Sequence, residues 1–179
     1  MKIYTRKGDD GTTGLLYGGR IPKDGPLPTA YGDVDEAQSF LGLARAETER
    51  GSELDGLLVH LERDLWVLMA DLATDGPNRH KLTDEATLVT AAMVARLEEQ
   101  IDALSARFEA PTEFVVPGES RVGALLDVAR TVTRRAERHA LAAAHSGSHV
   151  VPYLNRLSDL LWTMARWQEG TSLKAKEVV

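Results

Sequence analysis

No cysteine occurs among the 179 residues, so the chain can form no disulfide, thiolate metal site or cysteine nucleophile. Positive charge is also in short supply: 21 Lys and Arg against 27 Asp and Glu give a formal net charge of −6. A basic surface for nucleic acid is therefore not expected. Aromatic residues make up only 6% of the chain, but 43% of residues are apolar, which is typical of an ordinary globular protein.

Long apolar runs are missing as well. No stretch approaches the roughly 20 apolar residues that a membrane span needs, and the opening MKIY lacks the apolar core of a signal peptide. We therefore expect a cytoplasmic protein with no membrane or nucleic-acid partner. The length suits a single domain, 1–179, in which 1–28 form a glycine-rich segment, 29–168 a helical bundle and 169–179 a frayed tail.

Five segments repeat apolar residues at intervals of three and four, the spacing of an amphipathic helix. Short loops join them, so we predict an all-α fold, a five-helix bundle with ferritin-like up-and-down packing. The predicted helices cover about 31–49, the stretch from a Ser52 cap to the turn at 75–78, 83–108, 120–144 and 152–168.

Residues 4–19, YTRKGDDGTTGLLYGG, suit neither a helix nor an ordinary strand. Three glycines recur every three residues from Gly8 to Gly14, which would let the backbone approach a ligand and turn its N–H groups toward an anion. Threonine hydroxyls and the charges of Arg6 and Lys7 complete the inventory of a triphosphate cradle. The P-loop pattern G-x-x-x-x-G-K-[ST] is absent. A flexible or turn-rich leader is the competing interpretation.

Arginine is concentrated in ARTVTRRAERHA, residues 129–140. Helical spacing puts Arg130, Arg134 and Glu137 on one side, with Arg138 beside them, and the apolar residues on the opposite side. Five arginines and no lysine lie between positions 121 and 138, and the guanidinium fork suits phosphate recognition. A solvated, salt-bridged helix surface is the alternative.

Three shorter stretches hold further candidates. In YLNRLSDLLWTMARW, Asn155 could hydrogen-bond either a ligand or a neighbouring helix. In YGDVDEAQS, Asp33 suits a helix N-terminus, whereas Asp35 is the better candidate to pair with an arginine from another helix or another subunit. Phe114, in EFVVPG, is by itself more typical of a core aromatic.

Histidine-based chemistry finds no support in the sequence. The five histidines show no metal-ligand spacing, and neither H-E-x-x-H nor G-x-S-x-G occurs. We therefore exclude zinc enzymes and serine hydrolases.

Six motifs follow one another across residues 3–167: IYTRKGDDGTTGL, GGRIPKD, YGDVDEAQSFLGLARA, FVVPG, ARTVTRRAER and YLNRLSDLLWTMAR. In this order they resemble the PduO-type ATP:cob(I)alamin adenosyltransferase family, and RRAER followed by LNRLSDLL is highly specific. The resemblance implies a five-helix bundle that assembles as a homotrimer and binds ATP and a corrinoid at each subunit interface. Its activity would transfer the 5′-deoxyadenosyl group of ATP to the cobalt of cob(I)alamin.

The resemblance also implies roles for particular residues. The N-terminal segment would fold over ATP, and Mg²⁺ would share the charge of the phosphates. Carried over by position, the ATP-binding residues would be Thr5, Arg6, Lys7, Gly8, Thr13, Lys23, Arg134, Arg135, Glu137, Arg138 and Asn155. Three residues would serve catalysis. These are Arg130, Asp35, which pairs with it across the interface, and Phe114, which packs below the corrin and favours a four-coordinate cobalt.

Four positions depart from the pattern common in that family. The opening motif often reads T-G-D-K-G-T-T, whereas Lys7 here replaces the threonine and Asp10 replaces the lysine. Glu119 stands in place of a second glycine, and Asp127 in place of a frequent histidine. We expect these changes to tune affinity rather than abolish activity.

Two other classes stay open at this point: a non-catalytic bundle that binds ATP and corrinoid as a sensor or carrier, and a plain helical interaction module. The presence of both Arg130 and Phe114 favours the enzyme. The resemblance also implies partners beyond the substrates, namely a flavin reductase and an adenosylcobalamin-dependent mutase or dehydratase.

Overall fold

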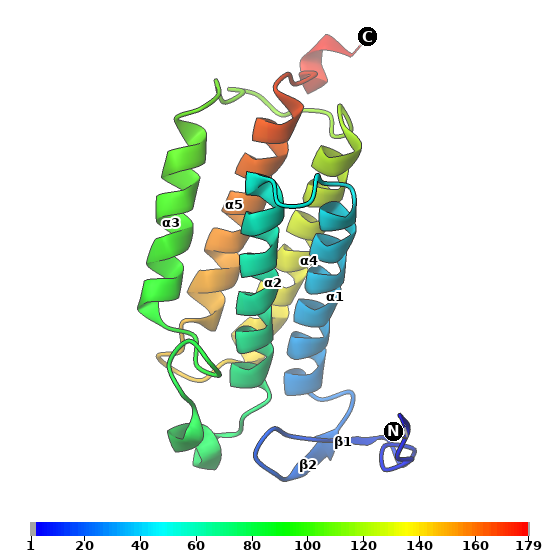
Figure 1. Cartoon of the computed structure of the whole chain (residues 1–179). Coiled ribbons are helices and arrows are strands. Elements are labelled where there is room, and N and C mark those ends of the chain that lie inside the picture. The colour runs from blue at the N-terminus through cyan, green and yellow to red at the C-terminus, as the bar shows by residue number, and fades with distance from the viewer. Residues whose placement is uncertain (1–2, 179) are drawn as a thin grey trace.

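A computed structural model describes residues 3–178 as five long helices preceded by a two-stranded hairpin (Figure 1). Strands β1 (Thr12–Gly14) and β2 (Arg20–Pro22) form the hairpin. The long helices are α1 (Pro26–Ala46), α2 (Glu53–Leu72), α3 (Ala91–Ser105), α4 (Arg121–Ala143) and α5 (Val150–Glu169). Two short 3₁₀ helices, η1 (Gly76–Lys81) and η2 (Ala175–Glu177), lie in the connections and the tail.

The helices form one bundle in which successive members run in opposite directions (Figure 1). α1 packs against α2 and α4, while α5 packs against α4 and α3. The predicted all-α, up-and-down bundle is therefore confirmed. The hairpin lies across the end of the bundle where α1 begins, and the C-terminus lies at the opposite end. No helix within residues 3–178 is long and apolar enough to cross a membrane.

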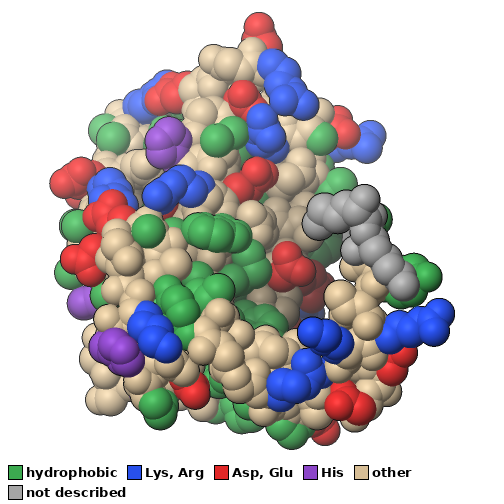
Figure 2. Space-filling view, turned by 60° about the horizontal axis from the view of Figure 1, so that its bottom comes forward, with side chains coloured by type: hydrophobic (Ala, Val, Ile, Leu, Met, Phe, Trp, Pro, Cys, Tyr) green, Lys and Arg blue, Asp and Glu red, His purple; other side chains and the backbone are tan. Residues whose placement is uncertain are grey.

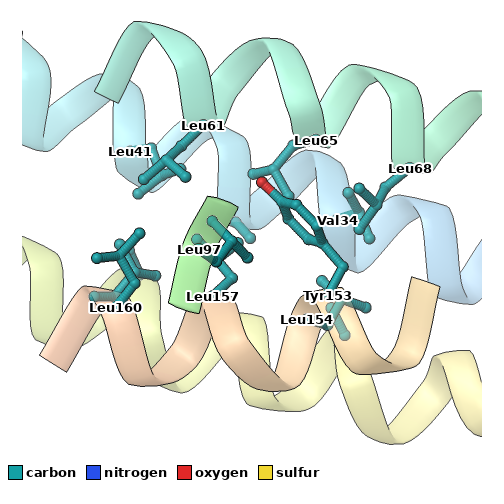
Figure 3. Close-up of a cluster of buried hydrophobic side chains, with 14 of the residues drawn as sticks. Val34, Leu41, Leu61, Leu65, Leu68, Leu97, Tyr153, Leu154, Leu157 and Leu160 are labelled. Carbon is teal, nitrogen blue, oxygen red and sulfur yellow. The ribbon is translucent and has the colours of Figure 1, made fainter. Parts of the chain in front are cut away.

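Leucines from four helices meet in the core, where their side chains point toward one another (Figure 3). Leu41 of α1, Leu65 of α2 and Leu157 of α5 are fully buried. Tyr153 of α5 is also fully buried, and its hydroxyl donates a hydrogen bond to Asp64 Oδ2 at 3.0 Å. Asp64 is half-buried, and this burial raises the pKa of its carboxyl group.

Three helices begin at side-chain caps. Ser52, Thr90 and Ser120 each accept a hydrogen bond from the backbone N–H three residues later. Such a bond satisfies an N–H group that has no partner inside the helix. The second and fourth helices therefore start where the sequence predicts.

Two predicted helix starts are wrong. The first helix begins at Pro26 rather than near residue 31, because prolines are tolerated in the first turn, where a backbone N–H is not needed. The third helix begins at Ala91 rather than at residue 83. The carbonyl of Thr83 accepts bonds from the amides of Thr87 and Leu88, and Glu85 has a positive φ of 56°. These local bonds close a turn in place of the first helical turns.

The tail pairs with the loop before α4 instead of fraying. The amide of Ala175 donates to the carbonyl of Phe114 at 2.8 Å, and the amide of Val116 donates to the carbonyl of Leu173 at 2.8 Å. Residues 113–116 therefore gain a short antiparallel partner from the end of the chain. This contact fixes the backbone of Phe114 although its side chain is exposed.

A pair of identical substitutions on α1 tests the assignment of the core. Leu41 is fully buried, whereas Leu43, two residues away, is 51% exposed. We expect Leu41→Ala to lower the free energy of unfolding by about 2–5 kcal/mol through lost burial and a cavity. Leu43→Ala should change it by less than about 0.5 kcal/mol. Urea unfolding followed by circular dichroism measures both. Equal losses would contradict the described burial of α1.

Candidate active site

The glycine-rich N-terminal segment is ordered as a hairpin fastened to the bundle. β1 and β2 pair antiparallel, with Thr12 opposite Pro22. Arg20 lies across the pair and donates to the hydroxyl of Thr12 at 2.8 Å and to its carbonyl at 3.1 Å. The amide of Leu16 donates to the carbonyl of Ala73, just beyond α2, at 2.9 Å. Turns and short strands thus hold the segment against the end of the bundle.

Within this segment, Gly8 and Lys23 come together as the sequence suggested. A Cβ at residue 8 would lie 3.0 Å from Nζ of Lys23, so glycine leaves room for the ammonium group beside the loop backbone. The amide of Lys23 in turn donates to the carbonyl of Gly11 at 2.9 Å. The hairpin therefore carries a positive charge close to a backbone that has no side chain in the way.

Asp10 stabilises the same turn. Its Oδ1 accepts hydrogen bonds from the amide of Thr12 at 2.9 Å and from the Thr12 hydroxyl at 2.7 Å. These bonds hold the pKa of Asp10 below its usual range. A residue that departs from the family pattern is thus engaged in shaping the loop.

The remaining predicted residues of the segment are accessible. Thr5, Arg6 and Lys7 are exposed, and Thr13 in β1 is half-buried. In the view of this end of the molecule, Lys and Arg side chains gather along the N-terminal segment, and hydrophobic side chains are visible on the bundle beside it (Figure 2). Cationic groups and hydroxyls at such a surface suit an anionic ligand such as a polyphosphate.

A second group of predicted residues lies on α4 and α5. Nδ2 of Asn155 donates to Oε1 of Glu137 at 2.9 Å, so these two candidates meet between the helices. Nη1 of Arg138 donates to the carbonyl of Arg134 at 3.0 Å, and both guanidinium groups are exposed. None of the hydrogen bonds and ion pairs described within residues 3–178 joins these side chains to the hairpin residues.

Arg135 is tied to α1. Its guanidinium group pairs with Glu36 and with Asp33, the latter at 3.3 Å, and the hydrogen bond that it donates to the Glu36 carboxylate raises the pKa of Arg135. Asp33 also contacts Nδ1 of His139. Asp33, expected only to favour a helix N-terminus, thus joins Glu36 in holding α4 against α1. The exposed carboxylate of Asp35 has no ion pair in the described part of the chain.

The predicted catalytic residues Arg130 and Phe114 meet at one cavity. The cavity has a volume of about 440 Å³ and lies between the loop 111–117, α4 and α5. Phe114 is 90% exposed, and the side chain of Arg130 is 27% exposed. The structure therefore excludes the interpretation of Phe114 as a core aromatic. Its ring is an apolar surface in contact with solvent at the edge of a site.

The inner wall of this cavity contains a buried ion-pair network that the sequence analysis missed. Asp127 accepts from Nε of Arg130 at 3.0 Å and from Nη2 of Arg166 at 2.5 Å. Arg166 also lies 3.0 Å from Oε2 of Glu169. Gly123 makes room for this acid, because a Cβ there would lie 2.6 Å from Oε1 of Glu169. The sequence did carry one signal of this network: Arg166 is a charged residue next to the apolar positions of its helix.

Comparisons with known proteins give matches over most of the chain. A family model described as cobalamin adenosyltransferase matches residues 3–168. A corrinoid adenosyltransferase of Mycobacterium tuberculosis (strain H37Rv) is 43% identical over 173 residues, covering 92% of this chain and 87% of the relative. A corrinoid adenosyltransferase of Citrobacter freundii is 42% identical over 173 residues, covering 95% and 96%.

Solved structures show the same fold. A phenylalanine-to-alanine variant of a PduO-type ATP:corrinoid adenosyltransferase from Lactobacillus reuteri, complexed with cobalamin and ATP, matches with a TM-score of 0.87 at 28% identity. That match covers 98% of this chain and 99% of the other. An arginine-to-lysine variant from the same organism, complexed with ATP, matches with a TM-score of 0.84 at 29% identity, covering 97% and 99%.

The buried Glu169 predicts a pH dependence of stability. Burial raises the pKa of its carboxyl group, partly offset by Arg166. From about pH 4.3, the pKa of a free glutamate, up to the raised value, the folded state holds a proton that the unfolded state has lost. Stability should therefore fall as pH rises through this window. Glu169→Gln should show a shallower decline, because burial also raises the pKa of Asp64 and Glu62, whereas the exposed control Glu99→Gln should keep the decline of the wild type.

Urea unfolding of the three proteins between pH 4 and pH 8 measures the effect. The quantity compared is the slope of the free energy of unfolding against pH. The same slope for Glu169→Gln and the wild type would mean that Glu169 titrates alike in the folded and unfolded states.

Proposed function

This chain belongs to the cobalamin adenosyltransferase family, and we propose that its reaction takes place where Arg130 and Phe114 share one cavity. The protein transfers the 5′-deoxyadenosyl group of ATP to the cobalt of cob(I)alamin and so forms adenosylcobalamin and triphosphate. The observation that carries the placement is the meeting of a cationic and an exposed aromatic side chain at a cavity of about 440 Å³.

The chemistry explains which side chains are needed. The electron pair of Co(I) forms the bond to the ribose 5′-carbon, and the electron pair of the broken carbon–oxygen bond leaves with the triphosphate. No proton has to move in this step. The protein must therefore orient the two substrates and stabilise the charge of the leaving group. Arginine, lysine and backbone N–H groups suit that task better than an acid or a base.

We propose that ATP binds along α4 and under the hairpin. The exposed Arg134 and Arg138, with Glu137 and Asn155 between α4 and α5, would hold the nucleoside end or its phosphates. At 1.5 Å per residue, Arg130 and Arg138 lie about 12 Å apart along the helix. That length lets one helix contact both the nucleotide and the site of transfer.

The hairpin would supply the rest of the ATP site. Thr5, Arg6, Lys7, Gly8, Thr13 and Lys23 form a cationic, hydroxyl-rich surface, and Arg135 would contribute through its position between α1 and α4. This donor set fits phosphate oxygens directly. Mg²⁺ would then arrive bound to the phosphates of ATP, where it lowers their negative charge.

Phe114 would pack below the corrin ring. Its exposed ring would offer the corrin an apolar surface, and burying that surface is favourable. The ring would also keep water and a lower axial ligand away from cobalt. A four-coordinate Co(II) is easier to reduce, because no axial ligand raises the energy of the orbital that accepts the electron. The cavity alone is at the small end of the range for ligand sites, so a corrinoid would extend onto neighbouring surface.

We further propose that the active unit is a homotrimer with sites at its subunit interfaces. We call the candidate ATP-binding residues of the N-terminal segment the hairpin group and those of α4 and α5 the α4 group. Within residues 3–178, no described hydrogen bond or ion pair joins the two groups, and Asp35 has no ion pair. A neighbouring subunit would bring them together and pair its own Asp35 with Arg130. A cytoplasmic location, a flavin reductase and an adenosylcobalamin-dependent mutase or dehydratase fit this role.

An anaerobic assay with ATP, Mg²⁺ and chemically reduced cob(I)alamin tests the function. We expect adenosylcobalamin and triphosphate in equal amounts, read from the corrin spectrum and by chromatography. Arg130→Ala should lower kcat about a hundredfold, the usual cost of one lost charge-stabilising donor. ATP binding without product would instead indicate a sensor or carrier. Unchanged turnover in Arg130→Ala would contradict the proposed role of this residue.

Mixing two inactive variants tests whether Asp35 and Arg130 act across an interface. Asp35→Ala and Arg130→Ala subunits, unfolded and refolded together, should recover about a quarter of wild-type activity. That fraction follows because each interface draws one residue from each neighbour. Each variant refolded alone is the control. If both residues came from the same chain, every site would carry one defect and the mixture would stay inactive.

A further inference from the structure

Asp127 of α4 holds two arginines at the wall of the cavity. Its side chain is only 6% exposed, and each of its oxygens serves a different guanidinium group. Oδ1 accepts from Nε of Arg130 at 3.0 Å, and Oδ2 accepts from Nη2 of Arg166 at 2.5 Å. One buried carboxylate thus connects a residue that faces the cavity to one that is enclosed by the bundle.

Arg166 has a second carboxylate beside it, although the hydrogen bond that it donates goes to Asp127. The side chain of Arg166 is 1% exposed, and Glu169, also 1% exposed, lies 3.0 Å from its Nη2. Two carboxylates therefore face two guanidinium groups, and Asp127 is the one of the two that pairs with Arg130. Asp127 therefore acts on Arg130 as well as on Arg166.

The geometry of the Arg130 pair matters for the reaction. Asp127 takes the hydrogen bond of Nε, and in residues 3–178 the two Nη groups of Arg130 have no described hydrogen bond. A guanidinium group held through Nε keeps both of its Nη groups available to a substrate or to a carboxylate of another subunit. Without this anchor, the long side chain would have to be ordered when the substrates bind.

We infer that Asp127 is a positioning residue for adenosyl transfer, because it fixes the Arg130 guanidinium at the cavity before the substrates arrive. The inference rests on the proposed role of Arg130. It is specific to a chain with an acid at position 127. A neutral imidazole has one acceptor nitrogen and could serve only one of the two arginines.

The test compares Asp127→Asn with a matched control. Asp159→Asn removes the acid of another i, i+3 pair, Arg156–Asp159, which is exposed on α5 and does not line the cavity. We expect Asp127→Asn to lower kcat about tenfold, the lower end for losing a hydrogen bond to a charged group. The KM for ATP should stay within about twofold. Asp159→Asn should match the wild type in both constants.

A double-mutant cycle shows whether Asp127 acts through Arg130. In an Arg130→Ala background, Asp127→Asn should cause no further loss of kcat, because the group that it positions is gone. The thermal midpoint, measured alongside, separates a loss of folded protein from a loss of rate. If Asp127→Asn fails to fold, Asp127→Glu replaces it, since it keeps the charge but moves the carboxylate by about 1.5 Å.

The outcomes separate this inference from the proposed function. Wild-type kcat in Asp127→Asn, with kcat lowered in Arg130→Ala, would overturn the positioning role and leave the role of Arg130 standing. The same tenfold loss in both backgrounds would also overturn it, because Asp127 would then act independently of Arg130. Wild-type kcat in Arg130→Ala would remove the proposed function of that residue, and the positioning role would fall with it.

Discussion

Close packing of α1 against α4 is the constraint on which the rest of the site depends. The two helices pack together, and both bury alanines: Ala30, Ala37 and Ala44 on α1, and Ala129, Ala136 and Ala140 on α4. Small side chains bring the helices close together, so that Arg135 and His139 can contact Asp33. α4 is thereby fixed in rotation. Any turn about its axis would drive arginine charges into the apolar core, which is costly.

Charge is distributed according to this arrangement rather than to the net charge of the chain. The protein is acidic overall, at −6, yet the hairpin and the exposed side of α4 are rich in arginine and lysine. Acids stand next to some of these polar and cationic groups and set their directions. Asp33 holds Arg135, Glu137 holds Asn155, and Asp10 shapes the hairpin turn. The positive groups are thus pre-arranged, which costs less at the moment of binding than ordering free side chains.

The sequence predicted the bundle well because each helix carries its own periodic apolar stripe and, in three cases, a capping side chain. It predicted Arg130 and Phe114 through a resemblance between motifs, and the structure places both at one cavity. The sequence could not predict contacts between positions that are far apart in the chain. Asp127 and Arg166 are 39 positions apart, and neither helix pattern alone indicates that the other supplies a partner. The prediction of a helix start at Thr83 failed for a local reason, since side-chain and backbone hydrogen bonds there compete with the helix.

A single chain presents the parts of the site but does not close it. Phe114 is 90% exposed, Asp35 has no ion pair within residues 3–178, and the hairpin group is not bonded to the α4 group. In the proposed trimer these features become the contacts that assemble the reaction. Folding would then fix the position of Arg130 within each subunit, while association would decide when both substrates can meet it.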